Sequence, residues 1–388
     1  MTATETPRFN LEIGDSGTAV DIEREESGGE EIHEPFDPEK IDVATRTPTV
    51  SLLLSRIRRK TIDLAPDFQR NAGIWKDVAQ SRLIESLLLR IPLPTFYAAE
   101  NPDESWSIVD GIQRLTSITR FMDPKSIGAD QLRLRGMEYL EAYNGHRFED
   151  LPGRLQTRLE ETEVVLHLIR QGTPEEVKFN IFARINTGGL PLTSQELRHA
   201  LIPGKARDLL TTLANSPEFI QATVGSVGRS RMADREMVLR FLAFLQTGPE
   251  SYQFQDFDLF LREAMRSINR LDDTETDTLG DHFRQSMITA WEIFGPYAFR
   301  KQYAEDAARN PVNKALFEAV SVSLARRSPQ ARKRLVASKK RVNLAFIRLM
   351  NDDALFNDSV SVGTGDVTKV QHRFHAIAKL FDSIGGKN

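Results

Sequence analysis

The feature that most constrains this chain is the uneven distribution of strand-forming segments along its 388 residues. Short runs rich in β-branched and aromatic residues lie in the first half, at 61–64, 95–100, 106–109 and 163–169, and a further short strand is predicted at Leu132–Leu134. A turn at 101–104 separates the second and third runs, which predicts a hairpin or neighbouring strands. Beyond about residue 205 such runs almost vanish, and apolar residues recur at helical spacing, as in 257–268 and 314–324. The pattern predicts an α+β protein whose N-terminal α/β domain is followed by an all-helical C-terminal domain.

Charge separates a third segment from these two domains. Residues 1–40 hold twelve acidic and three basic residues, a net −9, whereas the remainder of the chain carries +5. With few large apolar residues, this segment cannot bury enough surface to offset its ordering entropy. We therefore predict an acidic disordered tail at 1–45, the α/β domain at 46–204 and the helical domain at 205–388. Such a tail either masks a nucleic-acid surface or, the simpler interpretation, is only solvated.

The absence of cysteine excludes disulfides, thiolate zinc sites and cysteine nucleophiles, and it fits a reducing compartment. The N-terminus lacks a basic-then-apolar leader, and no apolar run approaches the ~18 residues of a spanning helix. We expect a soluble cytoplasmic protein without a membrane partner.

One motif indicates a specific chemistry. Residues 106–122 read as a strand, a glycine turn at Gly111 and an amphipathic helix. A glycine in that position lets backbone amides and the helix dipole approach an anion. Arg114, one helical turn later, is placed to clamp a phosphate, and Asp110 to hold a Mg²⁺ ion. Taken alone, an Asp-Gly turn before a helix is more often only a turn.

Two further loops carry hydrogen-bond donors. Gln69 and Arg70 follow a predicted strand, and a predicted helix ends in the run Arg184–Gly189, which includes Asn186 and Thr187. Three donor-rich loops in one small α/β unit indicate a polyanion site. Thr193–Glu196 is a predicted capping box opening the next helix. Trp75 and Trp106 are expected in the core.

Several motifs occur together and in order over residues ~48–200. They are Phe68-Gln69-Arg70, Ile91-Pro92-Leu93-Pro94, Val109-Asp110-Gly111-Ile112-Gln113-Arg114-Leu115-Thr116, Arg184-Ile185-Asn186-Thr187-Gly188-Gly189 and Leu192-Thr193-Ser194-Gln195-Glu196-Leu197-Arg198. This ordered set resembles the N-terminal domain family of GmrSD-type restriction enzymes, which has a ParB/sulfiredoxin-like fold.

The resemblance implies binding and Mg²⁺-dependent hydrolysis of a nucleoside triphosphate, coupled to restriction of modified or foreign DNA in anti-phage defence. The catalytic residues it implies are Asp110, Gln113 and Arg114, with Asp110 also holding the metal. The nucleotide-binding residues it implies are Gln69, Arg70, Gly111, Arg184, Asn186 and Thr187.

One departure keeps a second function open. The family loop usually reads Asp-Gly-Gln-Gln-Arg, and here Ile112 replaces the first glutamine. An apolar side chain cannot orient water or phosphate, so a non-catalytic nucleotide- or DNA-binding module that recruits a separate nuclease is the alternative. Direct cleavage of DNA by the ParB-like domain is a third hypothesis, resting on analogy more than on residues.

The remaining residues bear on partners. The chain shows no His-Asn-His nuclease arrangement, so cutting would fall to a partner subunit. His372 and His375 lie one turn apart and could share a metal, although surface or core histidines are the commoner case. Basic clusters at 326–327, 332–334 and 339–341 suit DNA phosphates, although such clusters are often solvated helix faces. The sequence leaves a monomer and a homo-oligomer open.

Overall fold

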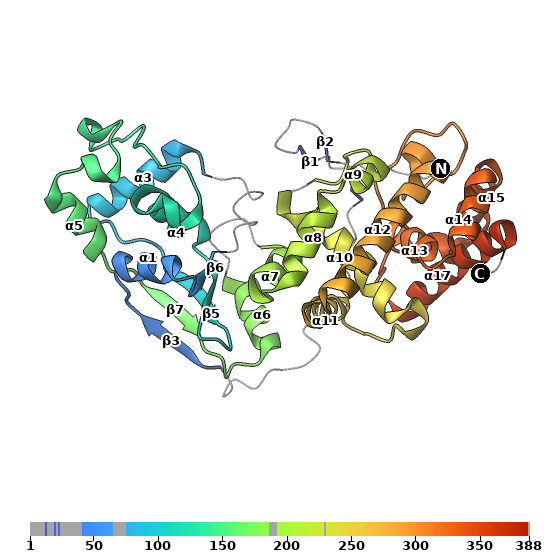
Figure 1. Cartoon of the computed structure of the whole chain (residues 1–388), viewed down its shortest axis with the longest axis horizontal. Coiled ribbons are helices and arrows are strands. Elements are labelled where there is room, and N and C mark those ends of the chain that lie inside the picture. Colours follow the sequence, from blue (N-terminus) through green and yellow to red (C-terminus); the bar gives the residue numbers. More distant parts are fainter. Residues whose placement is uncertain are drawn as a thin grey trace, which may run out of the picture. The chain divides into compact units, whose positions relative to one another are not determined.

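A computed structural model describes residues 12–13, 19–20, 22–23, 41–64, 75–185, 192–228 and 230–386, and Figure 1 gives the labels of its elements. The chain divides into two compact units, residues 32–201 and residues 202–388 together with 1–31. The first holds a small mixed sheet with helices and the second is helical, which confirms the predicted α+β class. None of the helices in the described ranges is long and apolar enough to cross a membrane.

The five-stranded sheet of the first unit has the order β3-β7-β5-β6-β4. Its strands are β3 (Val43–Arg46), β4 (Ile62–Asp63), β5 (Phe96–Glu100), β6 (Trp106–Asp110) and β7 (Leu166–Ile169). The predicted hairpin is confirmed, because β5 and β6 pair antiparallel. β4 lies parallel to β6 and β7 parallel to β5, whereas β3 pairs antiparallel with β7. The sheet thus begins inside the segment predicted as the acidic tail.

The described part of this unit also contains six α-helices. They are α1 (Val50–Arg58), α3 (Asp77–Leu88), α4 (Ile112–Met122), α5 (Gly153–Glu161), α6 (Glu175–Ile185) and α7 (Ser194–Leu201). α3 and α4 pack side by side, α1 contacts β4, and α7 contacts both β6 and α6 (Figure 1). Helix α4 starts directly after β6, so the predicted strand, glycine turn and helix are all present.

The segment between α4 and α5 corrects a prediction. A strand was expected at Leu132–Leu134, but the structure has irregular chain there, with the short 3-10 helices η2 (Pro124–Ile127), η3 (Glu141–Tyr143) and η4 (Phe148–Asp150). Buried Glu85 of α3 anchors the segment by accepting hydrogen bonds from the amides of residues 138–140 at 2.7–3.0 Å. Burial alone would raise the pKa of Glu85, but these three donors lower it below its usual value.

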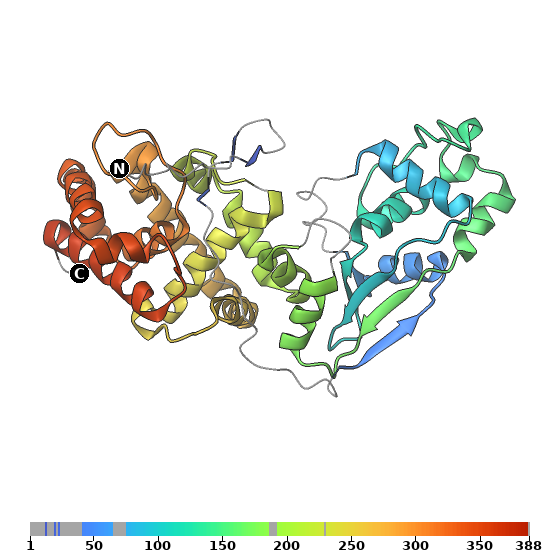
Figure 2. The ribbon, with the colours of Figure 1, turned by 180° about the vertical axis from the view of Figure 1, so that it is seen from behind.

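The described part of the second unit from residue 202 onward is helical, with only an isolated β-bridge between Arg300 and Val312 (Figure 2). Its α-helices are α8 (Lys205–Ala214), α9 (Pro217–Thr223), α10 (Ala233–Thr247), α11 (Phe257–Arg270), α12 (Asp273–Phe294), α13 (Lys314–Ala325), α14 (Pro329–Ala337), α15 (Lys339–Asp352), α16 (Ala354–Ser359) and α17 (Val367–Gly385). Short 3-10 turns precede α10, follow α10 and follow α12: η5 (Ser230–Met232), η6 (Pro249–Ser251) and η7 (Gly295–Tyr297). Helix α13 lies at the centre, against α10, α12 and α17.

A buried charge network fastens these central helices together. Glu318 of α13, which has no exposed surface, accepts hydrogen bonds from Arg240 of α10 at 2.8 Å and from Arg373 of α17 at 2.5 Å. Arg373 also donates to the carbonyl oxygen of Thr364 at 2.6 Å. The charges are therefore paired within a water-excluded core, as buried charges need to be.

A few N-terminal residues belong to the helical unit. β1 (Glu12–Ile13) and β2 (Ala19–Val20) pair antiparallel with each other. The amide of Glu23 donates to the carbonyl oxygen of Val312 at 2.9 Å, and its carboxylate pairs with Lys301 at 2.6 Å.

Candidate functional site

The candidate site is the turn where β6 leads into α4. Gly111 caps the helix with φ +96° and ψ 8°, a left-handed conformation that residues with a Cβ atom rarely adopt. A Cβ atom on Gly111 would lie 2.4 Å from Cδ1 of Phe96, well inside contact distance. The turn therefore requires glycine both for its backbone conformation and for its space.

The first turn of α4 is suited to an anion. The amide of Leu115 makes the first intrahelical bond, to the carbonyl of Gly111 at 2.9 Å, so the amides before it have no partner within the helix. Because the cap is glycine there is no side-chain cap, and the first turn contains no acidic residue. The positive end of the helix dipole thus faces the turn.

Arg114 is built into this turn. Its Nη2 atom lies 2.9 Å from Oδ2 of Asp110 and 3.2 Å from the carbonyl oxygen of Thr95, and its Nη1 atom bonds the carbonyl oxygen of Pro94. The guanidinium also sits 4.5 Å above the ring of Phe96. Burial lowers the pKa of Arg114, and the Asp110 carboxylate opposes that shift. A bidentate phosphate clamp by Arg114 would have to replace some of these partners.

The side chains of the neighbouring motif residues differ in exposure. The side chain of Asp110 is 37% exposed, so its carboxylate reaches the surface while it pairs with Arg114. Gln113 is half-buried and lines a hollow. Ile112 is 3% exposed and belongs to the core of the unit. Position 112 is thus a packing position here, which explains why an apolar residue fits it.

The hollow beside Gln113 has a volume of about 430 Å³. Its walls come from α4 and from the start of α3, with further residues after η2: Trp75, Lys76, Asp77, Gln80, Gln113, Thr116, Arg120, Ile127, Ala129 and Asp130. Arg120 pairs with Asp77 at 2.7 Å, and the buried hydroxyl of Thr116 has no hydrogen-bond partner among the described residues. The prediction that Trp75 is core is wrong, since it is 36% exposed, whereas Trp106 is buried as expected.

The other predicted site residues are described only in part. Gln69, Arg70, Asn186 and Thr187 lie outside the described residues, and of Arg184 only the backbone, within α6, is described. Two of the elements flanking them adjoin β6, the strand that leads into the turn. β4, which precedes Gln69, runs parallel beside β6, so both strands end at the same edge of the sheet.

Helix α7, which follows the Arg184–Gly189 motif, packs against β6. Its predicted capping box is confirmed: the amide of Glu196 donates to Oγ1 of Thr193 at 3.2 Å, and the amide of Thr193 donates to the Glu196 carboxylate at 2.7 Å.

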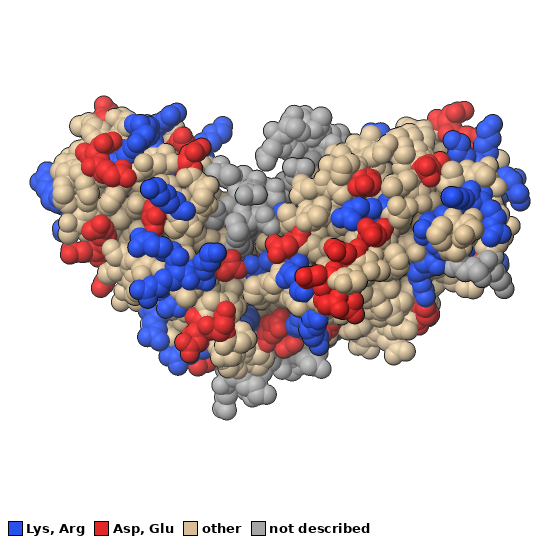
Figure 3. Space-filling view, viewed as in Figure 1, with Lys and Arg blue, Asp and Glu red and all other residues tan. Residues whose placement is uncertain are grey.

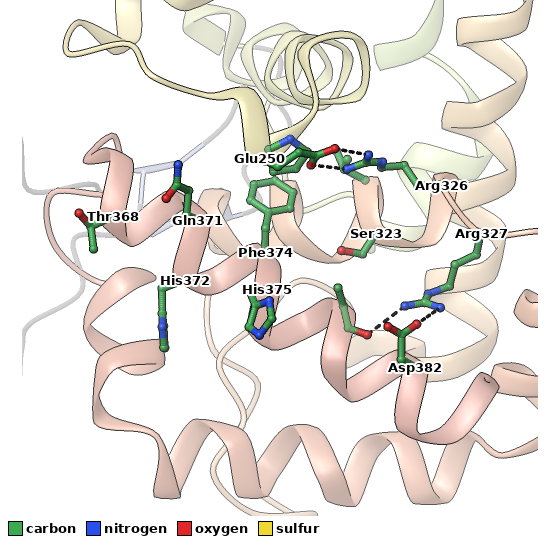
Figure 4. A pocket seen from close by; sticks show the side chains of 13 residues that line it. Glu250, Ser323, Arg326, Arg327, Thr368, Gln371, His372, Phe374, His375 and Asp382 are labelled. Carbon is green, nitrogen blue, oxygen red and sulfur yellow. Dashed lines mark hydrogen bonds and ion pairs between the residues drawn. The ribbon is translucent and has the colours of Figure 1, made fainter. Parts of the chain in front are cut away.

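The helical unit contains a larger cavity, of about 1000 Å³ (Figure 4). It lies between η6, the end of α13 and one face of α17, and its rim carries two ion pairs, Glu250–Arg326 at 2.5 Å and Asp382–Arg327 at 2.8 Å. His372 and His375 line it, and Nε2 of His372 lies 3.4 Å from Asp353. Within the described ranges, no group of three or more His, Asp or Glu residues is arranged to hold a metal.

A comparison with protein families assigns the first unit. Residues 50–203 match the family described as GmrSD restriction endonuclease, N-terminal domain. This segment is similar to a GmrSD-type N-terminal domain, and we call it the GmrSD-type domain. The match covers less than half of the 388-residue chain, and the helical unit after residue 203 lies outside it. No curated protein matches the sequence significantly.

Within the GmrSD-type domain, sequence reasoning found the turn but missed part of its surroundings. Thr116 and Arg120, which line the hollow with Gln113, were not singled out. A signal was present, because positions 113, 116 and 120 are polar and recur at i, i+3, i+7 along one face of an amphipathic helix. The carbonyl partners of Arg114, at 94 and 95, are about twenty residues away in sequence, and no local pattern marks them.

Proposed function

We propose that the GmrSD-type domain binds a nucleoside triphosphate with Mg²⁺ at the β6–α4 turn and hydrolyses it, as part of a DNA restriction system. The observation that carries this proposal is the combination of an uncapped helix start with a carboxylate–guanidinium pair that reaches the surface beside a hollow. Each part suits one portion of the nucleotide.

The phosphates fit the turn. Amides in the first turn of α4 donate toward the anion, and Gly111 lets the backbone approach closely. Arg114 already lies beside the turn and exchanges its bond with Asp110 for a phosphate oxygen when the nucleotide binds. The burial of its guanidinium requires an anionic partner, and a phosphate oxygen supplies that counter-charge in place of the carboxylate.

Asp110 supplies the metal ligand. Mg²⁺ is commonly held by one or two carboxylates together with phosphate oxygens and water, and Asp110 offers a surface-exposed carboxylate at the strand end. When bound, the ion neutralises charge that develops on the phosphate oxygens. The half-buried amide of Gln113, one residue before Arg114, orients the attacking water.

The nucleoside fits the hollow. Helix α4 rises about 1.5 Å per residue, so Thr116 lies about 7.5 Å along the axis from Gly111. Trp75, with 36% of its surface exposed, offers a face for stacking a base, and the unpartnered hydroxyl of Thr116 offers a hydrogen bond.

A second candidate function is nucleotide binding without turnover, in which the bound state regulates a separate nuclease. The burial of Ile112 favours it, because this position contributes no polar group to the turn. The two candidates share one site and differ only in whether phosphate is released.

The test is phosphate release and nucleotide-dependent thermal shift on the full chain with Mg²⁺ and each common nucleoside triphosphate. Asp110→Asn keeps the shape of the side chain and its hydrogen bond with Arg114 but removes the charge. We expect it to abolish release, while Glu160→Gln, an exposed residue of α5, leaves release unchanged. A thermal shift without release supports the second candidate. Neither shift nor release with any nucleotide would reject both.

A Thr116→Leu variant tests the nucleoside half separately. The larger side chain fills the hollow without touching Asp110 or Gly111, so the apparent nucleotide affinity should fall while inorganic triphosphate binds as before. Equal loss for both ligands would mean that the hollow does not hold the nucleoside.

A further inference from the structure

The helical unit contains a long acid-free segment. Residues 319–351 include nine Lys or Arg residues and no Asp or Glu, in a chain whose overall charge is −4. The flanking acids lie far from its centre: Glu318 is buried in the core, and Asp352 is about 20 Å along α15 from Lys339. The segment therefore carries a concentrated positive charge.

The fold gathers this charge on one corner. α14 ends and α15 begins at the same residue, Ser338, so the clusters on either side of it are joined by a single linking residue. We call the exposed cations here the α14–α15 basic surface: Lys333, Arg334, Lys339, Lys340, Arg341 and Arg348. Figure 3 shows Lys and Arg side chains gathered at this end of the helical unit.

The six cations have no carboxylate partner among the residues that the structure describes. None of them forms an ion pair in the part of the chain that the structure describes, whereas Arg326 and Arg327 in the same segment are held by Glu250 and Asp382. Mutual repulsion among neighbouring unpaired cations opposes folding. The stability of the fold therefore does not explain why these cations are present.

Helix electrostatics sharpen this point. Helices α8 to α12 each have an acidic residue in their first turn, whereas α13, α14, α16 and α17 have none there but begin with a side-chain cap bond. The first turn of α15 instead begins with Lys339, Lys340 and Arg341, and Ser338 makes no side-chain cap bond there. The cations and the helix dipole thus add to one positive field that no ion pair among the described residues compensates.

We propose that the α14–α15 basic surface binds the phosphate backbone of duplex DNA. The cations lie on two joined helices over several turns, an extent that fits a row of phosphates rather than a single small anion. The contacts are sequence-independent. This inference places DNA engagement on the helical unit and does not rest on nucleotide binding by the GmrSD-type domain.

The test is fluorescence anisotropy of a labelled duplex of arbitrary sequence with the full chain, without nucleotide. If about six phosphates are neutralised, affinity should fall about a thousandfold between 50 and 200 mM salt. The variant Lys339→Glu/Lys340→Glu should weaken binding about tenfold or more and reduce the salt slope by about two. Because acidic residues suit a helix start, its melting temperature should not fall.

A matched control separates location from net charge. Arg270→Glu/Arg309→Glu changes the charge equally at exposed positions elsewhere in the helical unit, and it should retain most of the affinity. Equal weakening by both double variants, or no weakening by the first, overturns the proposal. So does stronger competition by poly-glutamate or single-stranded RNA than by unlabelled duplex, since either identifies another partner. A nucleotide assay that fails leaves these outcomes unaffected.

Discussion

The two units each bury arginine side chains, but they pair them differently. In the helical unit Arg240 and Arg373 meet Glu318, a carboxylate with no exposed surface. In the GmrSD-type domain Arg114 meets Asp110, whose side chain is 37% exposed. A sealed pair has no access to ligands and fixes helices in place, whereas a pair with an open side can exchange partners. The same type of ion pair therefore stabilises helix packing in the helical unit, whereas in the GmrSD-type domain it leaves a carboxylate accessible to a ligand.

The largest loss of stability is expected when the buried carboxylate of Glu318 is removed. Glu318→Gln removes the carboxylate that pairs with buried Arg373 and leaves Arg240 with only its second partner, Glu236, and we expect a loss of about 3–5 kcal/mol in the free energy of unfolding. Urea denaturation measures it, with Glu263→Gln, which breaks a surface pair with Arg266, as the control expected to lose at most about 1 kcal/mol. Similar small losses in both variants would show that the core network is not sealed.

Next in size is the glycine of the open site. Gly111→Ala imposes a left-handed backbone on alanine and drives Cβ into Phe96, so we expect a loss of about 2–4 kcal/mol. Gly145→Ala is matched, because Gly145 has φ +86° but no atom near its Cβ, and it should lose only about 1–2 kcal/mol. If the two variants unfold at the same denaturant concentration, steric closure by Phe96 does not define the turn.

A smaller loss of stability is expected at the N-terminus of α7, where a capping box begins the helix. Thr193→Ala removes the hydroxyl that accepts the hydrogen bond from the amide of Glu196, and it should lower the free energy of unfolding by about 1 kcal/mol. Ser194→Ala, one residue later and inside the helix, should cost less. The same chemical denaturation compares them, and an equal cost would mean that the cap bond does not contribute.

This capping box also shows what the sequence could predict. Thr193 and Glu196, the β5–β6 hairpin and the turn at Gly111 depend on residues close together in the chain, so local patterns identify them. The partners of Arg114 and the network around Glu318 depend on residues tens of positions apart, which only packing brings together. The expected strand at Leu132–Leu134 failed because both leucines are buried by irregular chain that Glu85 anchors.

The smallest effect concerns a pair that is neither sealed nor in the candidate site. At the rim of the helical cavity, hydrogen bonding from Arg326 lowers the pKa of Glu250 to about 2 (Figure 4). Because the folded pKa lies below the unfolded value of about 4.3, the pair stabilises the fold above that value and loses its contribution as pH falls toward 2. The carboxylate side chain is 63% exposed, so the contribution should not exceed about 1 kcal/mol.

Thermal melts of the parent chain and of Glu250→Gln between pH 6 and pH 2 check this sign. We expect the parent to melt slightly higher at pH 6 and the difference to vanish toward pH 2, with added salt shrinking it at every pH because the pair is solvated. A difference that grows on acidification would mean that Glu250 is stabilised in its protonated form.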